Sequence, residues 1–113
     1  MEVRALATNL RVSPRKVRPV LGLIRGKPVE EALALLSFLP QPSARMVRKV
    51  VRSAAANAEA NYDLNPDALV VKSATAGDGR KLKRYRMGPR GRLSPRVKRY
   101  CHIEIVVEGD EVF

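Results

Sequence analysis

The 113-residue sequence contains one cysteine, one histidine and no tryptophan. A single cysteine, Cys101, cannot form an internal disulfide, so nothing indicates an oxidising compartment. Cys101 and His102 are neighbours in a predicted strand, where adjacent side chains point to opposite faces, so they do not form a nucleophile–base pair. Metal sites need several spaced ligands, and acid–base catalysis needs clustered carboxylates. Both are missing, so we predict no catalytic residues, no metal ligands and no cofactor.

Long apolar runs are also missing. No segment approaches the roughly 20 apolar residues of a transmembrane helix, and the N-terminal MEVRALATNL lacks the apolar core of a signal peptide. We therefore predict a cytoplasmic protein. Aromatic residues make up 4% of the chain and hydrophobic residues 45%, so the chain can fold around an aliphatic core. Its length suits a single domain over residues 1–113.

Acidic residues are absent between Arg80 and Arg99, a stretch that holds ten of the 22 Lys and Arg residues. The other 12 cations nearly balance the 11 Asp and Glu residues, although the net charge of the whole chain is +11. The sequence therefore describes a near-neutral domain that carries one intensely cationic segment. Such a segment repels itself unless a polyanion neutralises it. Nucleic acid is the first candidate partner, and an anionic membrane is the second.

Periodicity predicts a weak strand over residues 1–9 and then three helices. The first helix begins at Ser13-Pro14, a favoured pair for the N-cap and the first helical position. Its apolar stripe is interrupted by Pro19, which should bend the helix or loosen its first turn. A second, short helix starts at Pro28, and Ser43 is expected to cap the third and longest helix.

Two strand-like segments bracket the cationic stretch. ALVVKSATA is rich in Val and Thr, and YCHIEIVVEG alternates Ile103, Ile105 and Val107 with their neighbours. MGPRG between them has turn chemistry. The economical interpretation is one long antiparallel hairpin at about residues 78–101, which reaches about 30 Å beyond its base. Because a two-stranded ribbon of this length is marginal alone in water, we expect it to need a partner.

Other functions fit less well. The glycines at 77, 79, 88 and 91 lack the Gly-Lys-Ser/Thr ending of a phosphate-binding P-loop. Gly88-Pro-Arg-Gly91 matches the GxxG loop of a KH domain, but that loop joins two helices and this one lies between strands, which favours a hairpin turn. A membrane-bound basic protein would need a broad apolar face. A nuclease would need the missing acid–base or metal residues.

RNA binding is the favoured interpretation of the cationic stretch. Its cations are interleaved with the apolar or aromatic residues Leu82, Tyr85, Met87, Leu93 and Val97, which a disordered tail would not need. Arginine pairs with phosphate in a bidentate manner, and Tyr85 or Tyr100 can stack on a base. The predicted RNA contacts from the hairpin are Arg80, Lys81, Lys83, Arg84, Arg96, Lys98 and Arg99.

A second basic group surrounds the first helix. Its members are Arg11, Arg15, Lys16, Arg18, Arg25 and Lys27. The helix start at Ser13-Pro14 also offers free N–H groups, which bind phosphate well. On the third helix, Arg45, Lys49 and Arg52 lie mostly opposite the apolar stripe and join the predicted RNA contacts. Two basic patches on a small domain predict contacts with several RNA segments.

The stretches SPRKVRPVLGLIRGK, SAAANAEANYDLNPDALVVKSATAGDG and HIEIVV, together with the basic hairpin, closely resemble the bacterial large-subunit ribosomal protein twenty-two family. The resemblance covers almost the whole chain in order. It implies an α+β fold of three helices packed on a small antiparallel sheet with a long protruding β-hairpin. It also implies a non-enzymatic constituent of the large ribosomal subunit that binds large-subunit rRNA and supports subunit assembly. Its partners would be rRNA and neighbouring ribosomal proteins, with no membrane and no homo-oligomer.

The resemblance also assigns roles to particular residues. The hairpin tip is expected to line the nascent-peptide exit tunnel and to meet the nascent polypeptide, through Arg86, Met87, Gly88, Pro89, Arg90, Gly91 and Arg92. Ser13 matches the RNA-facing patch of the family, and Asn57 matches an asparagine of the third helix. The chain departs from the family pattern at Pro19, at Gly88, which separates a common Met-Pro pair, and at Pro95 on the return strand, which removes a ladder donor.

Overall fold

The computed structural model of the protein describes residues 2–109. Met1, where the first strand was predicted to begin, and residues 110–113 of the predicted domain lie outside this range. In chain order the elements are β1 (Glu2–Leu10), α1 (Pro14–Ile24), α2 (Val29–Phe38), α3 (Pro42–Tyr62), β2 (Val70–Met87) and β3 (Leu93–Glu108). Short 3₁₀ turns lie at Pro66–Ala68 and Pro89–Gly91.

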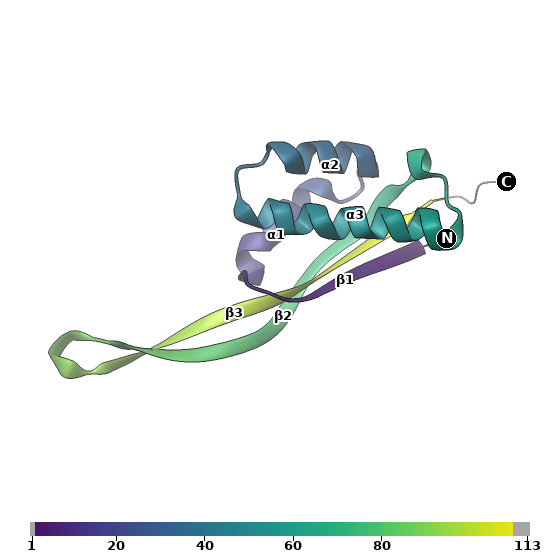
Figure 1. The fold of residues 1–113 in the computed structure, drawn as a ribbon. Helices are drawn as coiled ribbons and strands as arrows, with labels where there is room; N and C mark the ends of the chain where they lie inside the picture. The colour runs from purple at the N-terminus through teal and green to yellow at the C-terminus, as the bar shows by residue number, and fades with distance from the viewer. Residues whose placement is uncertain (1, 110–113) are drawn as a thin grey trace.

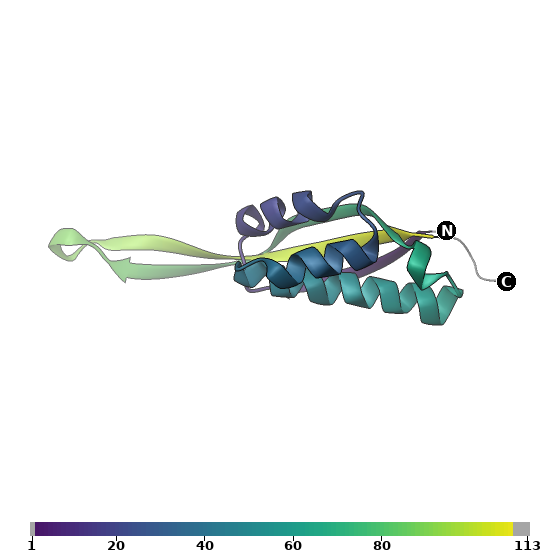
Figure 2. The ribbon, with the colours of Figure 1, turned by 90° about the horizontal axis from the view of Figure 1, so that it is seen from above.

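The three strands form an antiparallel sheet in the order β1-β3-β2, and the helices lie over one face of it (Figures 1 and 2). β2 and β3 continue far past the end of β1 as a two-stranded ribbon that projects from the body (Figure 1). The molecule is therefore elongated, with extents of 70 × 25 × 16 Å. The predicted α+β fold with a long protruding hairpin is confirmed.

The central strand β3 shows why the sheet forms. Ile103, Ile105 and Val107 are fully buried, whereas the intervening His102, Glu104 and Val106 are partly exposed. This period of two is that of a strand with one face on the core. The alternation seen in the sequence is confirmed, and it fixes which face of the sheet the helices cover.

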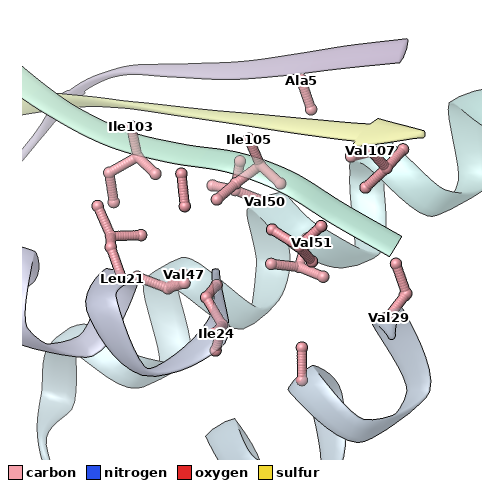
Figure 3. Close-up of a cluster of buried hydrophobic side chains, with 14 of the residues drawn as sticks. Ala5, Leu21, Ile24, Val29, Val47, Val50, Val51, Ile103, Ile105 and Val107 are labelled. Carbon is pink, nitrogen blue, oxygen red and sulfur yellow. The ribbon is translucent and has the colours of Figure 1, made fainter. Parts of the chain in front are cut away.

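The core between sheet and helices is aliphatic. Figure 3 shows Ile103, Ile105 and Val107 pointing from β3 toward side chains of the helices, among them Leu21 and Ile24 of α1 and Val47, Val50 and Val51 of α3. No aromatic side chain is buried among residues 2–109. Close packing of branched aliphatic side chains on a β-branched sheet face supplies the main stabilisation of the body.

The starts of two helices differ from the predictions. The second helix, α2, was expected to start at Pro28, but Pro28 is its N-cap and the helix begins at Val29. Ser13 occupies the N-cap position of α1 without a side-chain capping hydrogen bond, and α1 runs through Pro19 to Ile24. The expectation that Ser43 caps the third helix is wrong. α3 already begins at Pro42, and Ser43 is buried inside its first turn. The preset φ of proline makes it a favoured first helical residue, so α3 begins at Pro42, two residues before the start that a Ser43 N-cap would give.

Cys101 is the buried thiol at the edge of the core, and burial raises its pKa above the ordinary value of 9.0. The unfolded chain therefore ionises this thiol first, so the free energy of unfolding should fall as the pH rises above 9.0. We expect native protein at pH 8 to react with a disulfide reagent such as DTNB far more slowly than urea-unfolded protein. Equal rates in the two states, measured by absorbance, would contradict a closed core at this position.

Candidate nucleic-acid interface

The arm, residues 80–99, places like charges directly opposite each other across its two strands. Lys81 pairs with Arg99, and Arg84 pairs with Arg96, in the β2–β3 register. Like charges at opposed positions of an antiparallel pair destabilise it. Among the described residues, none from Thr75 to Tyr100 is buried, so the arm has no core to offset this repulsion. The arm is thus built to be neutralised by an external anion.

The predicted RNA contacts on the arm are all solvent-accessible. The cations Arg80, Lys81, Lys83, Arg84, Arg96, Lys98 and Arg99 are exposed. Several of them are adjacent in the sequence, as at Arg80-Lys81, Lys83-Arg84 and Lys98-Arg99. Because successive side chains of a strand point to opposite faces, the cations lie on both faces of the ribbon. A cationic ribbon with charge on both faces suits a site that is surrounded by phosphates rather than one flat surface.

The tip of the arm is closed by a tight turn. Pro89–Gly91 forms a 3₁₀ turn in which Arg90 and Gly91 have φ values of 59° and 74°, and the N–H of Gly88 donates to the carbonyl of Arg92. A Cβ at Gly88 would lie 2.7 Å from Ser94 Oγ and 3.0 Å from the carbonyl oxygen of Arg92. Any larger residue at Gly88 would therefore require Ser94 or the backbone at Arg92 to shift, so the departure from the family pattern at Gly88 fits this close approach. The turn leaves the Met87 side chain 79% exposed.

Three strands are tied together by Asn9 at the base of the arm, a residue that the sequence reasoning missed. The register of β1 on β3 shifts between Ala7 and Leu10, and Asn9 has a φ of 52°. Its backbone N–H donates to His102 Nδ1 at 3.1 Å, and its Oδ1 accepts from the N–H of Arg80 at 3.4 Å. Asparagine tolerates this left-handed conformation better than most residues. Asn9 thereby links the end of β1 to both strands of the arm.

Gly79 and Tyr100 complete this base. The β2–β3 register shifts between Asp78 and Lys81, and a Cβ at Gly79 would lie 3.1 Å from the Tyr100 carbonyl group. The guanidinium of Arg80 lies 5.1 Å from the centroid of the Tyr100 ring. This cation–π contact occupies a face of Tyr100, one of the two tyrosines predicted to stack on a base. Tyr85, farther out, is 69% exposed.

A basic groove of about 1010 Å³ lies where the arm meets the starts of α1 and α3. Its cationic walls are Arg11, Lys16, Arg84, Lys98 and Arg99. The N-cap residues of both helices, Ser13 and Gln41, also line it. Helix N-termini carry partial positive charge and free N–H groups, which favour anions. The groove unites the two basic patches seen in the sequence, and the wall from α3 was not foreseen because Gln41–Ser43 carries no charge.

The remaining predicted cations of α1 are divided between two roles. Arg15 is exposed at the start of the helix. Arg18 Nη2 donates to the carbonyl of Ala76 at 3.3 Å, and Arg25 Nε donates to the carbonyl of Ala74 at 2.8 Å. Both side chains thus hydrogen-bond to carbonyl groups of the sheet-edge strand β2, a structural role that the sequence did not reveal.

The loop after α1 continues this contact along the edge of β2. The carbonyl of Lys27, a residue predicted to bind RNA, accepts from the N–H of Val71 at 2.9 Å. The carbonyl of Val71 in turn accepts from the N–H of Gly26 at 2.8 Å. These bonds fix Lys27 against the sheet, with its side chain half-buried.

The predicted residues of α3 are spread along the helix. Arg45, Lys49 and Arg52 are exposed, and Asn57 is half-buried. Lys49 lines a smaller hollow of about 390 Å³ between α3 and β1, which shares Met46 with the basic groove. Arg45 is three residues from Pro42, which lines that groove. The structure therefore does not bring all of the predicted contacts to one site, and contact with several RNA segments stays a prediction.

Within residues 2–109, no three His, Cys, Asp or Glu side chains gather to hold a metal ion. Over the same range, no helix combines the length and the apolar character needed to cross a membrane.

Comparison with known proteins gives a consistent result. The family model described as ribosomal protein L22p/L17e matches residues 5–108. The chain is similar to proteins named large ribosomal subunit protein uL22. The Macrococcus caseolyticus protein is 53% identical over 99% of this chain and 90% of its own length. The Staphylococcus aureus protein is 52% identical over 98% of this chain and 96% of its own length. The Thermomicrobium roseum protein of that name is 48% identical over 96% of this chain and 92% of its own length. On these matches over nearly the full length, the chain belongs to the ribosomal protein L22p/L17e family.

Proposed function

We propose that the protein is a structural, non-enzymatic constituent of the large ribosomal subunit in the bacterial cytoplasm, where it binds large-subunit rRNA. The arm carries this proposal, because its opposed cation pairs Lys81–Arg99 and Arg84–Arg96 repel each other until a polyanion neutralises them. Its relatives named large ribosomal subunit protein uL22 support the same assignment. Neighbouring ribosomal proteins are the expected protein partners, and a second copy of the chain is not.

Binding works by neutralisation and shape. Arginine and lysine side chains displace counterions condensed on RNA phosphates, which supplies affinity without reading sequence. The basic groove holds an RNA backbone segment at the body, and the arm carries cations on both faces to phosphates of other segments. One protein thereby fastens RNA segments that are distant from each other, which is how it supports subunit assembly.

The tip of the arm is proposed to line the nascent-peptide exit tunnel. The 70 Å length of the molecule lets the body stay outside while the tip reaches deep into the RNA. Arg86 to Arg92 then present arginines and an exposed Met87 to the nascent polypeptide, around a turn that Gly88 and Gly91 keep narrow. The side chains of the tip lie outside the core, so the body does not need them to stay folded.

A photocrosslinking experiment tests the position of the tip. Ribosomes whose protein carries p-benzoylphenylalanine in place of Arg90 would be stalled on a radiolabelled nascent chain. We expect a covalent product between the protein and the nascent chain after irradiation. The same amino acid in place of Glu59, exposed on α3, is the matched control and should give none. Stable incorporation into the subunit without a nascent-chain product at position 90 would contradict the tunnel role while leaving RNA binding intact.

A further inference from the structure

Phe38, the last residue of α2, has the most exposed side chain of the large hydrophobic residues in the described chain, at 85%. The core of α2 is formed by Val29, Ala32 and Leu36. Phe38 follows Leu36 by two residues, which places it about 200° around the helix from this buried stripe. The Phe38 ring therefore does not contribute to the core, and it is available to contact a binding partner.

Phe38 lies at the end of the body that carries the basic groove. The short connection Leu39–Gln41 joins Phe38 to α3, and Gln41 and Pro42 line the basic groove. Three residues of extended chain place the Cα atoms of Phe38 and Gln41 no more than about 11 Å apart. Figure 1 shows this α2–α3 connection at the end of the helical layer from which the arm departs.

An aromatic ring beside a cationic groove suits a single-stranded nucleic acid. Phosphates neutralise the groove, and the bases of the same strand then lie within reach of a nearby exposed ring. Proteins that hold single-stranded RNA combine these two elements, a basic track for the backbone and aromatic rings on which unstacked bases rest. Tyr100, on the groove wall, already has Arg80 against its ring, whereas Phe38 at this end of the body is exposed.

We propose that Phe38 is a stacking platform for an unpaired base of the RNA strand whose backbone occupies the basic groove. This proposal rests on the proposed rRNA binding and adds a single-stranded nucleotide to its ligand. The ring takes any base, because every base has a π-face, so the selection is for an unstacked nucleotide and not for a sequence.

The test measures binding of the full-length protein to a large-subunit rRNA transcript as a function of salt. We expect Phe38→Ala to weaken binding by about five- to a hundredfold at every salt concentration, while the slope of log affinity against log salt stays unchanged, because stacking releases no counterions. Phe38→Tyr should bind like the parent, and Phe38→Leu should bind as weakly as the alanine variant. Chemical probing should show one unpaired base that the parent protects and Phe38→Ala does not.

Tyr62→Ala is the matched control, since Tyr62 is an exposed aromatic residue at the opposite end of α3, about 30 Å from Pro42. It should leave RNA affinity unchanged. Parent-like RNA affinity of Phe38→Ala together with poor incorporation into subunits would identify a protein contact and overturn the proposal. If replacement of the arm cations also left RNA affinity unchanged, the proposed rRNA binding itself would have failed, so the two failures are distinguishable.

Discussion

Replacing Lys81, Arg84, Arg96 and Arg99 together by glutamine is expected to weaken rRNA binding about a thousandfold at 0.1 M salt. Each phosphate contact adds about 0.7 to 0.9 to the slope of log affinity against log salt. Loss of four contacts should therefore flatten that slope by about three and remove about three decades of affinity at 0.1 M salt. Filter binding to an rRNA transcript across a salt series measures both quantities.

The same variant should behave differently when free. These four residues form the two opposed cation pairs of the arm, so their neutralisation removes cross-strand repulsion. We expect the free energy of unfolding to stay equal or rise while RNA affinity collapses. The matched control exchanges Lys and Arg at the same four positions, which keeps every charge and should keep the salt slope. An unchanged slope in the glutamine variant would show that the arm does not contact RNA phosphates.

The distribution of charge along the molecule predicts how it is oriented on RNA. The cations of the arm and of the basic groove occupy one end. Carboxylates gather at the other end, where Glu2 pairs with Glu108 in the sheet and Glu30 and Glu31 lie in the first turn of α2. Glu2 is also paired with Lys72, so this end carries little free positive charge. We therefore expect RNA to favour the first end over the second.

The parts of the fold that local patterns specify could be predicted from the sequence. The alternation of Ile103, Ile105 and Val107 revealed the face of β3, and the acid-free stretch before it revealed the arm. The start of α3 was misplaced by two residues, from an N-cap at Ser43 to one at Gln41, because Pro42 suits both a helix break and a first helical residue. The sequence does not decide between these two roles of Pro42. The folded chain does, because Ser43 is buried inside the first turn that begins at Pro42.

The candidate site was only partly predictable, because its geometry comes from segments that are distant in the sequence. Its charges were evident, but the groove forms from Arg11, Gln41 and Lys98, and no local pattern joins them. Asn9 was missed for the same reason, since its partners His102 and Arg80 are 93 and 71 residues away. Phe38 carries no charge and belongs to no motif, and only its exposure in the folded chain singles it out.

Replacing Ile105 by alanine is expected to lower the free energy of unfolding of the free protein by about 2–5 kcal/mol, as for other large-to-small core changes. Ile105 is fully buried on the central strand, where it points toward the helices (Figure 3). A domain of this size has about 5–15 kcal/mol in total. The melting temperature should fall by roughly 10–20 °C, measured by circular dichroism. Val106→Ala, on the other face of the same strand, is the control and should cost much less.

RNA should partly rescue the Ile105→Ala variant. A ligand that binds only the folded state adds about 2.7 kcal/mol of stability when present at a hundred times its Kd. Ile105 does not belong to the arm or to the basic groove, so the folded variant should bind rRNA with the affinity of the parent. Its melting temperature should therefore rise in saturating rRNA by as much as that of the parent. Absence of this rise in the parent would mean that RNA binds the unfolded chain equally well, through charge alone. The groove and the shape of the arm would then contribute nothing to recognition.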